Sequence, residues 1–76
     1  MVKYIVARHH GESDAYYQRG QRYPLAIKTR FFSKKVEIYK RRGYHDEMDP
    51  GSHRTFADMD SFEEVWSDVR DDRHGW

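Results

Sequence analysis

The sequence predicts a small single domain of the α+β class, with a three- to four-stranded antiparallel sheet and a C-terminal helix packed on one face. A length of 76 residues leaves room for one domain, spanning 1–76. Apolar and polar residues alternate over 22–44, as is typical of a β-hairpin. Near the C-terminus an apolar stripe recurs at helical spacing, formed by Phe62, Val65, Trp66 and Val69.

The chain opens with a predicted strand at residues 3–8, which is rich in β-branched and aromatic residues. Apolar side chains fall on both of its faces, so we expect a central strand. Between Ser13 and Arg19 the pattern favours a short helix or turn, because Ser13 is a suitable N-cap and Gly20 a suitable C-terminal residue. An extended segment stays open as the alternative, since Tyr16 and Tyr17 favour strands.

The central element is a hairpin at about 22–42, with its turn near residues 33–35 and Pro24 at its entry. One face is apolar and is expected to face the core, through Leu25, Ile27, Val36 and Ile38. After it, Asp49-Pro50-Gly51 predicts a β-turn. Residues 53–56 predict a short last strand.

The other face of the hairpin is basic and aromatic. Residues 22–44 hold eight Lys and Arg against one acid, a net charge of +7. Cations neutralise phosphates and exposed aromatics stack on bases, but the same residue types also anchor protein interfaces or simply keep a strand face solvated. The candidate binding residues of this face are Lys28, Arg30, Phe32, Lys34, Lys35, Tyr39, Arg41 and Arg42.

A C-terminal helix is predicted at about 60–72, with Asp60 or Ser61 as its cap and Glu64 completing a capping box. Its apolar stripe should lie on the sheet, which makes Trp66 the expected largest contributor to the core. Whether Trp76 packs back on the sheet or anchors a partner stays open.

The two halves of the chain have opposite charge. Residues 1–45 carry eleven Lys/Arg and three Asp/Glu, a net charge of +8, whereas residues 46–76 carry three and ten, a net charge of −7. Either the halves neutralise each other across the fold, or each presents a contact surface. An acidic helix face can occupy a basic groove meant for nucleic acid. Its candidate binding residues are Glu63, Glu64, Asp68, Asp71 and Asp72.

The five histidines lack the short spacings of a metal site, so we expect loop histidines and no metal or other cofactor. The stretch from Gly51 to Phe56 carries Gly-Ser-His before a short strand and resembles the local motif of HicA-type ribonuclease toxins. That resemblance, over six residues, implies that His53 acts as a general acid or base while the basic hairpin holds RNA.

The leading functional hypothesis is a small non-catalytic regulator that docks on a nucleic-acid-handling protein and modulates or inhibits it. In size and charge density the chain is similar to small phage-encoded regulators that dock on host machinery. Direct DNA or RNA binding through the hairpin is the first alternative, and a HicA-like ribonuclease using His53 is the second. With no cysteine and no apolar run of about 20 residues, we expect a cytoplasmic protein that does not engage a membrane.

Overall fold

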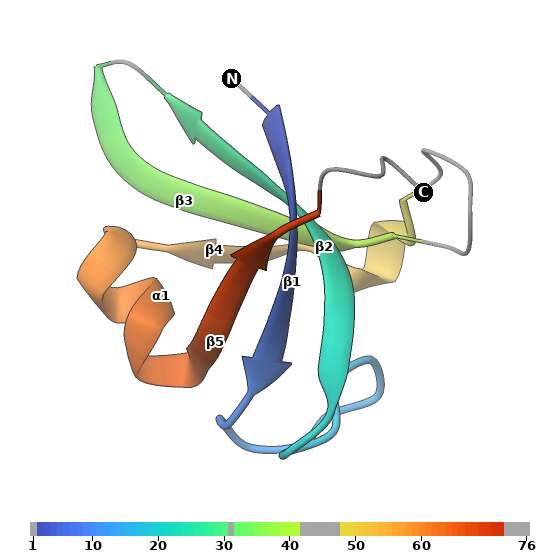
Figure 1. The fold of residues 1–76 in the computed structure, drawn as a ribbon. Helices are drawn as coiled ribbons and strands as arrows, with labels where there is room; N and C mark the ends of the chain where they lie inside the picture. The colour runs from blue at the N-terminus through green and yellow to red at the C-terminus, as the bar shows by residue number, and fades with distance from the viewer. Residues whose placement is uncertain (1, 31, 42–47, 73–76) are drawn as a thin grey trace.

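The computed structural model describes residues 2–30, 32–41 and 48–72 and shows a small single domain with one five-stranded antiparallel sheet (Figure 1). The strand order is β4-β3-β2-β1-β5. The prediction of an α+β domain is therefore confirmed, although the sheet has more strands than expected. The elements are β1 (Val2–His9), β2 (Arg22–Arg30), β3 (Ser33–Lys40), the 3₁₀ turn η1 (Pro50–Ser52), β4 (Arg54–Phe56), α1 (Met59–Val65) and β5 (Trp66–Asp71).

The first predicted strand is β1, and its central position is confirmed because it lies between β2 and β5. Ile5 and Ala7 face the core and are fully buried. Tyr4 and Val6 fall on the opposite face and are half-buried, as expected for a strand with neighbours on both edges.

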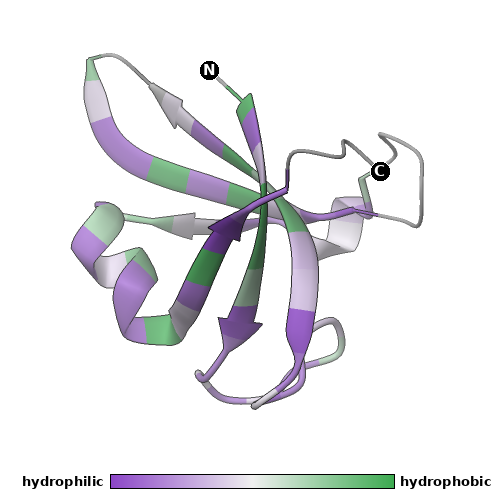
Figure 2. Cartoon of the chain, viewed as in Figure 1, coloured by the Kyte–Doolittle hydropathy of each residue, from purple (hydrophilic) through white to green (hydrophobic). Residues whose placement is uncertain are grey.

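The predicted hairpin is β2 and β3, which pair from Leu25 opposite Lys40 to Arg30 opposite Ser33. Figure 2 shows hydrophobic and hydrophilic residues alternating along β3. The predicted inward residues Leu25, Ile27, Val36 and Ile38 are all buried. The predicted turn position was wrong by about two residues, because Ser33, Lys34 and Lys35 already belong to β3.

The early helix predicted at 13–19 is absent, and a folded loop connects β1 to β2 instead. The Asp14 carboxylate accepts hydrogen bonds from the backbone N–H groups of Tyr16 (2.8 Å) and Tyr17 (2.9 Å). Such side-chain to backbone bonds compete with helix formation. Gly20 has a φ of 88°, a left-handed conformation that glycine adopts at little cost, and its N–H donates to the His9 carbonyl (2.6 Å).

The helix predicted at 60–72 is the main correction. The helix α1 is shorter and begins earlier, capped by Asp58, whose carboxylate accepts from the Ser61 N–H (2.8 Å). It ends at Val65, because Trp66 has extended backbone angles (φ −125°, ψ 139°). Neither Asp60 nor Ser61 is the cap, and Glu64 lies in the last turn instead of at the third position.

Residues that follow the helix form β5, which pairs with β1 from His9 opposite Trp66 to Ile5 opposite Asp71. Ser, Asp and Val are weak helix formers, and the free edge of β1 offers strand partners to Trp66, Ser67, Arg70 and Asp71. The pairing shifts register between Val6 and Arg8, where Asp68 adopts a φ of 52°. This shift is a β-bulge, which bends the strand and increases its twist.

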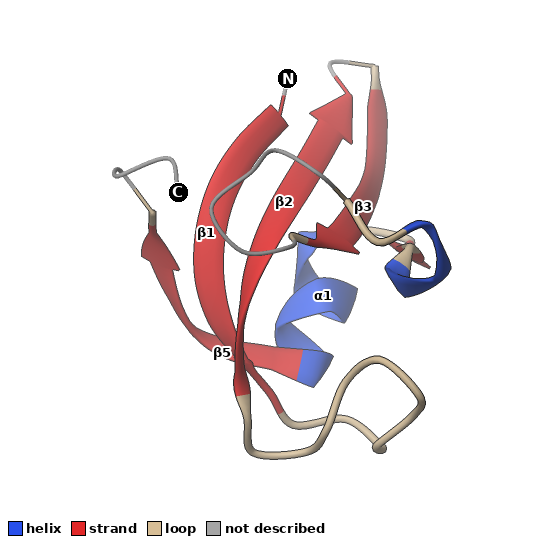
Figure 3. Ribbon diagram, turned by 90° about the vertical axis from the view of Figure 1, so that its right-hand side faces the viewer, coloured by secondary structure: helices blue, strands red, loops and turns tan. Residues whose placement is uncertain are grey.

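The core lies between the sheet and α1, which is on one side of the sheet in Figure 3. Trp66 is 1 % exposed, which confirms its predicted role. Its ring contacts those of His9 (4.7 Å between centroids), Tyr17 (5.1 Å) and Phe62 (6.2 Å). The predicted turn at Asp49-Pro50-Gly51 is confirmed as part of η1.

We predict that Trp66→Ala removes about 3–5 kcal/mol from the free energy of unfolding, because the lost indole leaves a cavity in the centre of the core. Val69→Ala is the control, since Val69 shares the predicted helical stripe but is 41 % exposed. Thermal unfolding followed by circular dichroism measures both. Equal melting temperatures for the Trp66 variant and the unmodified protein would contradict the assignment.

Candidate functional site

The candidate residues of the basic face differ in their exposure to solvent. Lys28, Lys34 and Lys35 are exposed, and Phe32 is 97 % exposed. Tyr39 is half-buried. Arg30 ends β2, while Arg42 and Trp76 lie outside the described residues.

Arg41 lies on the predicted outward face, yet its side chain is completely buried. Its Nη2 donates to the Asp72 carboxylate, which is 7 % exposed, and its guanidinium lies over the Tyr4 ring at 4.4 Å. The Asp72 N–H also donates to the Tyr4 carbonyl (3.0 Å). Arg41 and Asp72, predicted on separate contact surfaces, therefore form an internal ion pair.

Two more of the predicted helical acids, Asp68 and Asp71, lie on β5. Asp68 pairs with Arg22 of β2, and Asp71 pairs with Lys3 of β1 at 3.1 Å. Together with Arg41–Asp72, these pairs join cations from the first half of the chain to acids from the second. Neutralisation across the fold thus accounts for part of the charge division.

Glu63 and Glu64 are the only two of the five candidate acids that lie on α1, and both are exposed. Asp60, in the first turn of α1, is exposed as well. Hydrogen bonds from the N–H and hydroxyl of Ser61 lower the pKa of the Asp58 carboxyl from its ordinary value. Asp58 is therefore ionised at neutral pH, and the helix presents a carboxylate-rich surface.

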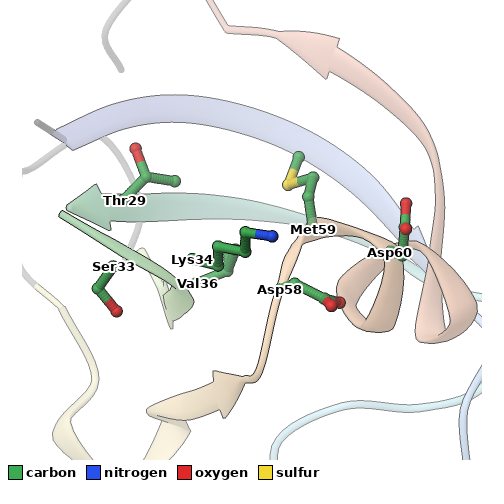
Figure 4. Close-up of a pocket in the computed structure, with 7 residues that line it drawn as sticks. All are labelled: Thr29, Ser33, Lys34, Val36, Asp58, Met59 and Asp60. Carbon is green, nitrogen blue, oxygen red and sulfur yellow. The ribbon is translucent and has the colours of Figure 1, made fainter. Parts of the chain in front are cut away.

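A pocket of about 400 Å³ lies where the turn end of the β2–β3 hairpin meets the start of α1 (Figure 4). We call it the hairpin-end pocket. Its apolar part includes Val36, which is buried, and Met59, which is 41 % exposed. In Figure 4 the Lys34 side chain extends toward the segment that carries Asp58 and Met59. The lining residues are Thr29, Ser33, Lys34, Val36, Asp58, Met59 and Asp60.

A second pocket, of about 360 Å³, lies between the β1–β2 loop, β4 and the end of α1. We call it the aromatic pocket, because Tyr17, Phe56 and Trp66 line it together with Val65. The buried His9 also lines it, and its Nε2 lies 3.0 Å from the Glu12 carbonyl oxygen.

Two carboxylates, Glu12 and Asp14, also line the aromatic pocket. Burial raises the pKa of Asp14, but hydrogen bonds from the N–H groups of Tyr16 and Tyr17 and the ion pair with Arg54 (3.1 Å) outweigh it. The net result is a lowered pKa. Asp14 therefore stays ionised at neutral pH.

His53, the residue singled out by the HicA resemblance, stacks on Tyr39 at 4.6 Å between ring centroids. Its Nε2 lies 3.1 Å from the Glu37 carboxylate. This pair can orient an imidazole, but neither the hairpin-end pocket nor the aromatic pocket includes His53.

Within the described ranges, no group of three or more His, Asp or Glu side chains is arranged to hold a metal ion. No helix in this part of the chain is long and apolar enough to cross a membrane.

The sequence did not indicate that Asp58, Met59 and Thr29 line one pocket. The signal for Asp58 was present, because Asp is a preferred N-cap and Asp58 precedes the helix directly. Thr29 and Met59 are 30 positions apart in the chain, and only the packing of α1 against β3 brings them together.

We predict that Asp72→Ala destabilises the fold by about 3 kcal/mol or more, because it leaves the buried Arg41 cation without its carboxylate partner. Asp71→Ala is the matched control. Its pair with Lys3 is exposed (49 % and 62 % for the two side chains) and should contribute less than about 1 kcal/mol. Urea denaturation compares the two variants, and equal small losses would argue against a structural role for the buried pair.

We predict that the buried phenol of Tyr17 makes the free energy of unfolding fall at alkaline pH. Burial raises the pKa of its phenol from 10.0 to about 12, although its hydroxyl donates to the Ser52 carbonyl (2.8 Å). The unfolded chain therefore loses this proton first, and stability falls by about 3 kcal/mol as pH rises from 10 to 12. The Tyr17→Phe variant has no phenol to titrate, so its stability should not fall in this way. At neutral pH it should be about 1 kcal/mol less stable than the unmodified protein, because the hydrogen bond to the Ser52 carbonyl is lost. Urea denaturation at several pH values should show the two stabilities crossing above pH 10, with the unmodified protein the less stable of the two near pH 12; parallel curves would refute the shift.

Comparisons of the chain with protein-family models, with curated proteins and with solved structures gave no match. The resemblances to HicA-type toxins and to phage regulators therefore gain no support from a relative. The geometry of the described residues is the basis for a functional assignment.

Proposed function

We propose that the protein is a non-catalytic regulator that binds a nucleic-acid-handling protein and modulates it by occupying part of its surface. The contact surface is the hairpin-end pocket together with Phe32, which directly precedes Ser33 of its lining. The observation that carries the proposal is the meeting of exposed apolar anchors and charges of both signs at this place.

The apolar anchors support a protein partner. Four large hydrophobic residues of the described chain are exposed, Val2, Phe32, Met59 and Val69. Two of them, Phe32 and Met59, belong to this contact surface. Phenylalanine and methionine are enriched in protein interfaces, where a few such residues supply most of the binding energy.

The charges favour a protein over a nucleic acid. Lys34 shares the pocket with Asp58 and Asp60, so a phosphate backbone drawn to the lysine would meet two carboxylates. Direct nucleic-acid binding relies on cations that follow the phosphate backbone. The buried pair Arg41–Asp72 removes a further cation from the surface.

The acidic side of the surface supports the class of partner. Glu63 and Glu64 extend the negative charge of Asp58 and Asp60 along α1. A complementary partner surface is basic, and grooves that hold nucleic acid are basic. Occupation of such a groove would compete with the nucleic acid.

We predict that the double variant Phe32→Ala, Met59→Ala binds the partner at least about 30-fold more weakly, the loss expected for a hot spot of about 2 kcal/mol. The partner is first captured with tagged protein from a lysate of the native organism, at moderate salt and after nuclease treatment. Purified partner then gives the affinity by calorimetry, and its association rate should fall as salt is raised.

The matched control is Val2→Ala, Val69→Ala, which removes two exposed apolar side chains elsewhere (54 % and 41 % exposed) and should leave affinity within about 2-fold. Equal affinities of the two double variants would overturn the surface assignment. Retention of nucleic acid alone, abolished by nuclease, would favour the direct nucleic-acid alternative. Ribonuclease activity lost in His53→Ala would favour the catalytic one.

A further inference from the structure

The register of the sheet shows which backbone N–H and C=O groups of β4 point toward its outer edge. Arg41 N–H donates to the Pro24 carbonyl (3.0 Å), which makes this a hydrogen-bonded pair of the β2–β3 ladder. Such pairs alternate along antiparallel strands. The backbone groups of Tyr39 therefore point to β2, and those of Ile38 and Val36 point to β4.

Lys40 confirms this alternation independently. Its N–H donates to the Ser52 hydroxyl (2.7 Å) and its carbonyl accepts from the Asp49 N–H (3.0 Å), so both groups point away from β2.

On β4, Arg54 pairs with Ile38 and Phe56 pairs with Val36. These are the hydrogen-bonded pairs, so the N–H and C=O of Thr55 between them point away from β3, toward the outer edge. Among the described residues neither group has a hydrogen-bond partner. Strand β4 is also the last strand of the sheet on this side.

Two pockets flank this edge, and Thr55 belongs to both. The aromatic pocket lies toward the core side, where Phe56 and Val65 line it. A polar pocket of about 300 Å³ is lined by Ser33, Lys35, Glu37 and Thr55. An added β-strand points alternate side chains to opposite faces, and each face of this edge has a pocket to receive one.

We propose that the edge of β4 binds an extended segment of a partner protein by β-strand addition. Thr55 supplies the main-chain donor and acceptor. One side chain of the segment is apolar and enters the aromatic pocket. Its neighbour in the segment is polar and lies on the Lys35 and Glu37 side.

A second copy of β4 fits this edge less well than a foreign segment. Its Arg54 side chain is held by Asp14 and by the carbonyls of Gly51 (3.0 Å) and His53 (2.8 Å). Its Phe56 ring packs edge-on against Phe62 at 5.5 Å. Neither side chain is available to fill the pockets of a partner copy. The site adjoins the hairpin-end pocket, with which its polar pocket shares Ser33, but it does not depend on the function proposed above.

The test uses a displayed library of random heptapeptides selected against the full chain. Thr55→Pro removes the outward N–H, which an edge strand tolerates, and Thr55→Val keeps it. We expect selected peptides to alternate apolar and polar residues, to lose at least about 10-fold in affinity for Thr55→Pro and to bind Thr55→Val within about 3-fold. The Phe32→Ala, Met59→Ala variant should bind them unchanged.

A second measurement tests the proposal even if the Thr55→Pro variant does not fold. Peptides N-methylated at the residue opposite Thr55 should bind at least about 10-fold more weakly, because the main-chain bond is lost. In the complex, amide exchange at Thr55 should slow markedly. A library without enriched peptides, or peptides insensitive to Thr55→Pro and to N-methylation, would overturn the proposal. Thr55-dependent self-association of the protein would assign the edge to a second copy instead and overturn it too.

Discussion

The burial of Trp66 is the constraint on which the rest of the structure depends. Its ring lies in the aromatic cluster of the core, while its backbone is the point where α1 ends and β5 begins. A continued helix would carry the following residues away from the sheet. The extended backbone of Trp66 instead brings them to the free edge of β1, which gives the first strand a partner on each side.

The position of β5 then determines the electrostatics. Because β5 runs beside β1, its acids meet the cations of the first half of the chain, and the pair Arg41–Asp72 that follows is almost entirely removed from water. Buried pairs of this kind contribute little net free energy, but breaking one is costly. Exposed charge that remains for contact in the described part of the chain includes the lysines of the hairpin and the carboxylates of α1.

The two edges of the sheet differ in how readily another strand can add to them. On the β5 side, a bulge at Asp68 and a sequence of charged residues discourage another strand from adding. On the β4 side, the outward backbone groups of Thr55 lie between two pockets. The hairpin-end pocket shares Ser33 with the polar pocket of that edge, so both proposed contact sites lie near the same end of β3.

The sequence by itself determined what depends on local periodicity: the strands 3–8 and 22–40, the inward faces of the hairpin, the turn at Asp49 and the burial of Trp66. It also indicated Phe32 and Lys34 as surface residues. Tertiary structure alone decided where the helix stops, because residues 66–71 have a weak preference for either state and the free edge of β1 selects the strand. It likewise decided that Asp72 pairs with Arg41 and that Met59 joins Thr29 in one pocket. These outcomes rest on contacts between residues far apart in the chain, which no local pattern records.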